Sequence, residues 1–231
     1  MSKNNVTKPD ELQEVNQALG KAEAFIETNL TKIIAGVLVV IVVALGVVLF
    51  RTKYVAPREL KAQEQIFRGE NYFAVDSFRV AIYGDNEGYI GFKKIIDEYG
   101  ITKTANLAKA YTGISYFKLG DFKNATVFLD KFKADDKMVS PAVIGLIGDC
   151  YVEMGDKNKA ISLFLKAANK ADNDVVSPLY LRKAGTAYES QSNYAKAIEV
   201  YTTIQDKYPN SPIANEMEQR IGRATVLSTQ Q

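Results

Sequence analysis

The chain has 231 residues, of which 47% are hydrophobic, and it carries 29 basic and 27 acidic side chains. This near balance argues against nucleic-acid binding as the main function, because phosphate binding needs a surplus of Lys and Arg on one face. The sequence has no His and a single Cys, Cys150. These counts exclude His-dependent catalysis, His-ligated metal sites, multi-Cys zinc sites and an intrachain disulfide. We expect Cys150 to be a small buried helix residue, and we expect no metal and no cofactor.

The segment before residue 33 is predicted to be polar and partly helical. Residues 1–9 are expected to be disordered. From Asp10 to Leu30, apolar residues recur at helical spacing with acidic residues between them, which predicts a short amphipathic helix with the stripe Leu12, Val15, Leu19, Ala22 and Ile26. Two interpretations stay open. The helix docks onto a membrane partner, or it lies in the membrane interface as a marginal helix, and we favour the second.

Residues 33–50 predict a transmembrane helix. None of these 18 residues is charged or strongly polar. As a helix they extend roughly 27 Å, close to the thickness of the hydrocarbon core of a bilayer. A cleaved signal peptide fits less well, because the preceding segment is long and no small-x-small cleavage site follows. A core helix of a soluble domain would keep a polar face, which this segment lacks.

The membrane segment divides the chain into four expected parts. Residues 1–32 form an N-terminal cytoplasmic segment, 33–50 the transmembrane helix, 51–103 a juxtamembrane helix with a degenerate repeat, and 104–231 a helical array. The flanking charges are Lys21 and Lys32 before the membrane, and Arg51, Lys53, Arg58 and Lys61 after it. By the positive-inside rule alone, the large C-terminal part would lie in the cytoplasm.

Three windows between residues 104 and 212 repeat the same pattern. Their anchor glycines are Gly113, Gly148 and Gly185, which are 35 and 37 residues apart. Each window also has a Tyr three residues after the glycine (Tyr116, Tyr151, Tyr188) and an Ala in the following helix (Ala125, Ala160, Ala197). Small residues let two helices approach closely, and the Tyr fills the wedge between them. Turn glycines and N-cap candidates separate the helices of the first two windows: Gly120, Gly155, Asp121 and Asp156.

This pattern resembles the tetratricopeptide repeat (TPR), which implies an all-α solenoid of stacked helix pairs. A degenerate fourth unit is expected before the three clear ones. In it, residues 88–100 resemble residues 197–209, and the partner helix runs from about Arg58 to Ala81, with a loop over residues 84–88. A final helix from Ser211 to Leu227 would cap the array, with Ile213, Met217, Ile221 and Ala224 facing inward.

In a curved TPR array, the first helix of each pair lines the concave face. The repeat phase assigns Gly145, Ser190 and ten candidate protein-binding residues to that face: Ala110, Ile114, Phe117, Lys118, Asp149, Val152, Glu153, Arg182, Thr186 and Glu189. The set mixes apolar and polar types and has no cluster of Lys and Asn that would grip a chain terminus. An extended segment or a partner helix is therefore the expected ligand.

The stretch Ala24–Gly36 leads directly into the membrane helix, and a TPR array follows. This arrangement resembles the YfgM-like ancillary subunits of the SecYEG translocon, and residues 92–100 and 129–137 are most similar to the Bacteroidetes branch. The resemblance implies a single-pass protein of the bacterial inner membrane with a periplasmic C-terminal domain. Its partners would be translocon subunits, a periplasmic chaperone or an unfolded client. We follow this orientation over the flanking charges, because large domains translocate largely regardless of charge.

Three other functions are weighed against this one. The chain could be a scaffold of another envelope assembly or secretion machine, or a membrane adaptor that faces the cytoplasm. Enzyme activity is not expected, because the carboxylate pairs Asp135–Asp136 and Asp172–Asp174 lie in turns between repeats, where caps and solvated loops explain them. The sequence also has no glycine-rich phosphate loop.

Overall fold

The computed structural model describes the backbone of residues 9–230 and the side chains of residues 16–230. Over this range the regular structure is helical throughout, with no strand. The chain divides into two compact units, Met1–Pro57 and Arg58–Gln231. The segment expected to be disordered lies, except for its last residue, outside the described residues.

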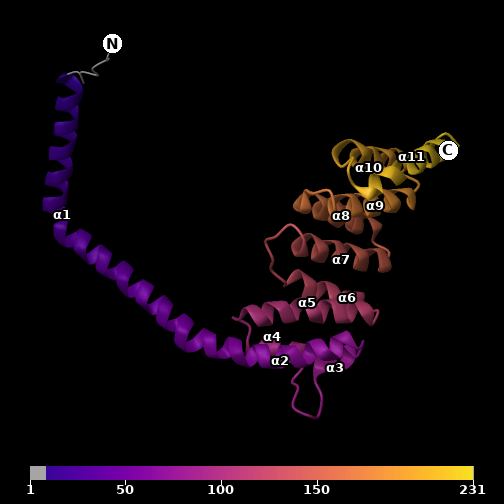
Figure 1. Cartoon of the computed structure of the whole chain (residues 1–231), viewed down its shortest axis with the longest axis horizontal. Helices are drawn as coiled ribbons and strands as arrows, with labels where there is room; N and C mark the ends of the chain where they lie inside the picture. The colour runs from indigo at the N-terminus through magenta and orange to yellow at the C-terminus, as the bar shows by residue number, and fades with distance from the viewer. Residues whose placement is uncertain (1–8, 231) are drawn as a thin grey trace. The chain divides into compact units, whose positions relative to one another are not determined.

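The N-terminal unit consists of helix α1 (Pro9–Phe50) and a π-helical turn, η1 (Arg51–Val55). Figure 1 shows α1 as one continuous ribbon that bends along its length. The helix expected before the membrane is present, but it is continuous with the apolar segment 33–50 instead of forming a separate short helix. The apolar residues of that segment are exposed, and the helix is long and apolar enough to cross a membrane.

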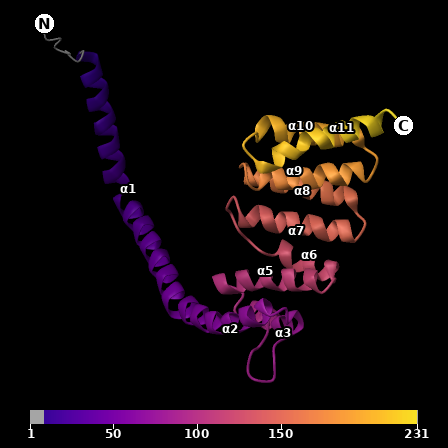
Figure 2. The same cartoon turned by 45° about the vertical axis from the view of Figure 1, so that its right-hand side comes forward.

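The C-terminal unit is a stack of antiparallel helix pairs, as the views in Figures 1 and 2 agree. Neighbouring helices along the chain pack against each other. The stack ends in a 3-10 turn, η2 (Pro212–Glu216), and helix α11 (Met217–Ser228). The three regular pairs are α5 (Lys103–Lys118) with α6 (Phe122–Asp130), α7 (Val139–Glu153) with α8 (Lys157–Ala171), and α9 (Ser177–Glu189) with α10 (Tyr194–Lys207).

The anchor glycines are notches for large side chains of the second helix of the same pair. A Cβ atom on Gly148 would lie 2.7 Å from the ring of Phe164, and one on Gly185 would lie 2.2 Å from the ring of Tyr201. Gly113 meets Leu129 in the same way, at 2.5 Å. The three predicted alanines of the second helices, Ala125, Ala160 and Ala197, are fully buried. The predicted repeat phase and the α-solenoid are therefore confirmed.

The turns within the pairs also follow the prediction. Gly120 and Gly155 have φ of +76° and +82°, which glycine adopts without strain. Ser192 takes this place in the last pair with φ of +58°. The next residue caps the second helix in each case, by accepting a hydrogen bond from a backbone N–H three residues later: Asp121, Asp156 and Asn193.

The degenerate unit is a fourth pair, but its first helix is shorter than predicted. Helix α2 (Ala56–Ala74) is followed by a turn in which Asp76 has φ of +57°. The N–H of Ser77 then bonds to the carbonyl of Tyr72 at 2.9 Å, as the corresponding residues do in the three regular turns. The prediction of a single helix from Arg58 to Ala81 is therefore wrong. Ala81 lies in α3 (Phe78–Tyr83), at the position of the buried alanines in the second helices.

An inserted loop interrupts the second helix of this pair. Helix α3 stops at Tyr83, the loop occupies residues 84–91, and α4 (Phe92–Glu98) resumes the helix. Phe92 contacts Gly69, whose added Cβ would lie 2.4 Å from its ring, as Tyr201 contacts Gly185. Gly69 thus continues the series of notches, and the insertion explains why it stands 44 residues before Gly113.

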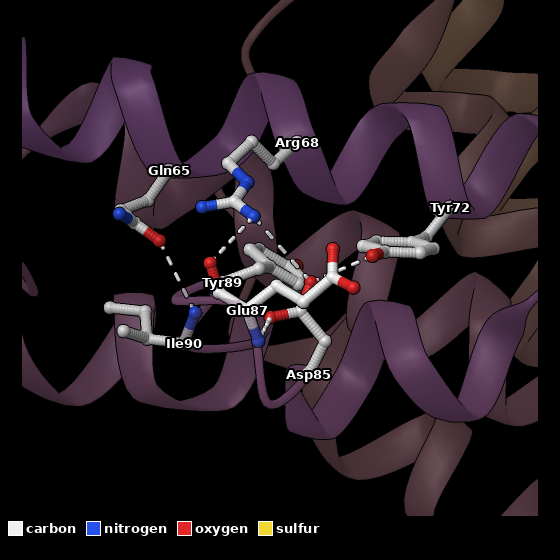
Figure 3. Close-up of polar contacts among 7 residues, drawn as sticks. All are labelled: Gln65, Arg68, Tyr72, Asp85, Glu87, Tyr89 and Ile90. Carbon is white, nitrogen blue, oxygen red and sulfur yellow. Dashed lines mark hydrogen bonds and ion pairs between the residues drawn. The ribbon is translucent and has the colours of Figure 1, made fainter.

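Side chains of α2 hold the inserted loop in place. Arg68 donates to the carbonyl of Glu87 at 3.1 Å and lies 3.7 Å from the Asp85 carboxylate. The Tyr72 hydroxyl donates to Asp85 at 2.7 Å. This bond, and to a smaller extent the bond from the Tyr89 N–H, keeps the pKa of Asp85 below its usual value. Figure 3 shows the whole cluster: Gln65, Arg68, Tyr72, Asp85, Glu87, Tyr89 and Ile90.

The N-terminal pair is also fixed to the next one. The Glu59 carboxylate of α2 accepts hydrogen bonds from the N–H groups of Lys103 (2.8 Å) and Thr104 (3.2 Å), at the N-terminus of α5. A carboxylate at this end of a helix satisfies orphan donors and complements the helix dipole. The array therefore begins within α2, at Arg58, which is the first residue of the C-terminal unit.

The capping helix begins later than predicted. Residues 212–216 form the 3-10 turn η2, and the α-helix begins at Met217. The residues expected to face inward do so. Met217 and Ala224 are fully buried, and Ile213 and Ile221 pack against the same core as Tyr201.

Candidate protein-binding site

An apolar groove lies between the first helices of two consecutive pairs, α5 and α7, and has a volume of about 450 Å³. Both helices present apolar residues at i, i+4 and i+7, a spacing that forms a stripe along one face. Leu107, Met138 and Val139 are 41%, 55% and 50% exposed, so this surface is open to a partner. The groove is lined by Leu107, Ala110, Tyr111, Ile114, Phe132, Met138, Val139, Ala142, Val143 and Leu146.

The linker between α6 and α7 forms one wall of the groove. Helix α6 has 9 residues, whereas α8 and α10 have 15 and 14, so the chain leaves the helix early at Asp130. Asn106 of α5 then pairs with both backbone groups of Lys133, at 2.8 and 3.0 Å. This fixes the linker across α5, and Phe132 and Met138 line the groove as a result.

The end of the linker is held by Asp136. Its carboxylate accepts hydrogen bonds from the N–H of Met138 (2.7 Å) and of Val139, and these bonds keep its pKa below the usual value. Asp135 pairs with Lys170, and Asp172 pairs with Lys207 at 3.0 Å. The interpretation of these carboxylates as caps and turn residues is confirmed for Asp136.

A second groove, with mixed polarity, lies between α7 and α9 and has a volume of about 350 Å³. Lys183 bonds to both oxygens of Asp149, at 2.8 and 2.7 Å, and lies 5.6 Å from the centre of the Phe164 ring. Asp149 and Lys183 therefore neutralise each other, and Lys157 and Arg182 remain as further basic residues of the lining. The lining residues are Asp149, Val152, Lys157, Phe164, Arg182, Lys183, Thr186, Ala187 and Ser190.

The structure places six of the ten predicted residues at these two grooves. Ala110 and Ile114 line the apolar groove, and Asp149, Val152, Arg182 and Thr186 line the mixed groove, as does Ser190. Arg182 also pairs with Glu216 at 3.2 Å, which links α9 to the capping turn.

The other four predicted residues line neither groove. Phe117 is half-buried, and its ring packs edge-on against Phe122, with the two ring centres 5.6 Å apart. Lys118 and Glu153 are exposed at the ends of α5 and α7. Glu189 is 13% exposed and pairs with Arg223 of α11, so its carboxylate joins the last pair to the cap.

One further residue assigned to the concave face lies in the core. A Cβ atom on Gly145 would be 2.0 Å from the ring of Tyr180. Gly145 is thus a second notch in α7, which receives the next pair instead of a ligand.

The sequence pattern missed most of the apolar groove. Leu107 and Tyr111 lie at helical spacing before Ile114, and Val139, Val143 and Leu146 have the same spacing in α7. These stripes could have predicted an exposed apolar surface, because they lie beside the notch glycines, which face the second helix of the same pair. Nothing in the repeat pattern predicted that Phe132 and Met138 of the linker would join them.

Cys150 is fully buried, as predicted, and burial raises the pKa of its thiol to about 11. We expect the folded protein to resist Ellman's reagent at pH 8, because both the thiolate fraction and the access are low. The same sample should release one equivalent of chromophore after unfolding in guanidinium chloride, since the chain has a single Cys. Full reaction before unfolding would contradict the buried position.

Comparison with known proteins agrees with this architecture. Two profiles described as "Tetratricopeptide repeat" match residues 142–169 and 180–211, which cover most of the pairs α7/α8 and α9/α10. No curated protein sequence matches the chain. The chain therefore carries tetratricopeptide repeats, whose stacked helices serve as protein-interaction modules.

Solved structures show the same fold. The crystal structure of MamA protein superposes with a TM-score of 0.55 at 19% identity and covers 73% of this chain and 85% of that one. A crystal structure of a Podosopora anserina putative kinesin light chain, with nearly identical TPR-like repeats, gives 0.53 at 11% identity, with 74% and 88% covered. At these identities the likeness concerns the fold alone.

Proposed function

We propose that the chain is a membrane-anchored interaction module that binds a polypeptide segment through large apolar side chains. The observation that carries this proposal is the open apolar groove between α5 and α7, with Leu107, Met138 and Val139 exposed at its rim. Exposed apolar surface of this kind marks interaction sites. Met is well suited to it, because its flexible side chain adapts to different partners.

The neighbouring groove would supply the polar contacts of the same ligand. Thr186 and Ser190 offer hydroxyl groups, and the Asp149–Lys183 pair offers charge of both signs. A helical or extended segment with apolar anchors at one end and polar groups at the other fits these two neighbouring grooves.

For the location, we propose the bacterial inner membrane next to the Sec translocon, with the repeats in the periplasm. The resemblance of the N-terminal and repeat segments to translocon-associated subunits supports this, as does the long apolar helix α1. An open apolar groove suits an unfolded client or a chaperone. Protease treatment of spheroplasts tests the orientation, since a protected C-terminal unit would contradict a periplasmic location.

The partner can be identified by copurification from mild detergent. Recovery of SecYEG with a periplasmic chaperone supports the translocon assignment. Recovery of outer-membrane insertion machinery would support the alternative, a scaffold of another envelope assembly.

The groove itself is tested by site-specific photo-crosslinking in cells. A photoreactive residue at Ile114 should give adducts with a partner, whereas the same residue at Lys123 or Asn158, exposed on second helices, should not. Replacing Leu107 and Met138 together by Asp should lower the adduct yield about tenfold or more, because a charge would be desolvated in the groove.

Val175→Asp is the matched control for this loss. Val175 is also an exposed apolar residue, at 70%, but it lies in the turn before α9 and outside both grooves. With the photoreactive residue at Ile114, the Val175→Asp chain should give the same adduct yield as the chain without this substitution. Equal yields for the double variant and this control would reject the groove as the binding site.

A further inference from the structure

The N-terminal half of α1 carries an apolar stripe with no partner among the described residues. Leu19, Ala22, Ile26, Asn29 and Ile33 are spaced three, four, three and four residues apart. Leu19, Ile26 and Ile33 are 61%, 50% and 38% exposed. In the sequence, Leu12 and Val15 continue the same spacing toward the N-terminus. A seven-residue repeat of this kind is the seam of a coiled coil.

The charge of this segment argues against a membrane surface as the occupant of the stripe. Between residues 10 and 33 there are five acidic residues and two basic residues, Lys21 and Lys32. Interfacial helices need Lys and Arg on the polar face to bind anionic lipids, and an acidic helix is repelled.

The stripe is complementary to itself. Two copies of one membrane protein insert in the same direction, so their α1 helices would run parallel and in register. Each Asn29 would then face the Asn29 of the other copy. A carboxamide both donates and accepts hydrogen bonds, so this pairing satisfies both side chains. The Asn29 amide already donates to the Phe25 carbonyl at 3.0 Å, which uses one of its two hydrogens.

The positions beside the seam carry no like charges that would meet across it. In a parallel pair, Ala18 faces Glu23 of the other copy, and Phe25 faces Leu30. Phe25 and Leu30 are 64% and 49% exposed, so a second copy would cover them together with the seam. The charged residues Lys21 and Glu27 lie on the outer faces of the helix.

We propose that α1 pairs with α1 of a second copy as a parallel, in-register coiled coil that leads into the two membrane helices. Each dimer would present two repeat arrays, and therefore two apolar grooves, from one membrane site. Two linked binding sites raise the effective affinity for a ligand that engages both.

Cysteine crosslinking of the full-length chain in its membrane tests this pairing. The native Cys150 is buried, and Cys150→Ala removes any background. In that background, Ala22→Cys and Ile26→Cys place a thiol in the seam. Lys21→Cys and Thr28→Cys place one at the same depth on the outer face. After brief oxidation, the seam variants should give about tenfold more disulfide-linked dimer than the outer variants.

Two results confirm the identity and the geometry of the product. Coexpressed copies with two different tags should both appear in the crosslinked band. Adding Ile26→Asp to the Ala22→Cys chain should lower the dimer about tenfold, because the charge would be buried in the seam. Equal crosslinking on both faces, no dimer at either seam position, or a band containing a different protein would overturn the proposal. None of these readouts depends on the groove.

Discussion

Replacing Gly148 by Leu should destabilise the array by about 3 kcal/mol or more, because no space exists for a side chain at this position. A Cβ atom alone would lie 2.7 Å from Cε1 of Phe164 and 2.9 Å from Cδ1. The ring cannot easily move away. Phe164 is 2% exposed and stacks on Tyr180, with the ring centres 6.4 Å apart. Urea unfolding of the intact protein in mild detergent, followed by circular dichroism at 222 nm, measures the loss.

Gly222→Ala is the control for this substitution. Gly222 is also within a helix, but an added Cβ would have no atom within 4 Å. Alanine should leave stability unchanged or raise it by up to about 1 kcal/mol, from helix propensity alone. An unchanged unfolding midpoint for Gly148→Leu would show that α7 and α8 do not meet at this notch.

Phe164→Ala should cost about 3–5 kcal/mol, since it removes one of the largest fully buried side chains and leaves a cavity. The ring fills the notch of Gly148 from α8 and contacts Tyr180 of α9, so it joins two consecutive pairs. It also lines the mixed groove. The same unfolding experiment measures the cost.

The double variant Gly148→Leu/Phe164→Ala separates this explanation from general damage. The Leu side chain would occupy the space that the Phe ring leaves, so the double variant should be more stable than the sum of the two losses by at least about 1 kcal/mol. Tyr201→Ala is the matched control partner. Tyr201 is as buried as Phe164 but fills the notch of Gly185, so its combination with Gly148→Leu should be additive. Additivity in both cases would contradict the notch contact.

In the N-terminal pair, the repeat period alone does not predict where the helices begin and end. Gly69, Tyr72 and Ala81 hold the spacing of the regular windows, and Asp76 takes the place of the turn glycine. The prediction instead used the similarity of residues 88–100 to residues 197–209 and read one helix through to Ala81. An insertion of residues 84–91 had moved the second half of the helix along the sequence. Only the contact of Phe92 with Gly69 reveals which residues correspond.

The position of the two candidate grooves was predicted in outline. The first helices of the pairs do border the two grooves, and Ile114, Asp149 and Arg182 lie where the phase put them. Glu189 was predicted to be accessible, but Arg223 of the capping helix pairs with it. Such a partner comes from an element 34 residues away, which a local pattern cannot include.

The apolar helix, the repeat period and three of the notches, Gly113, Gly148 and Gly185, can be read from the sequence alone. These features follow from local properties: hydrophobicity, and the absence of a side chain where two helices must touch. The tertiary structure decided where the array is open. The early end of α6 and the pairing of Asn106 with the Lys133 backbone bring linker residues beside α5, and the apolar groove results. Its shape depends on contacts between residues distant in the chain, and no spacing in the sequence encodes them.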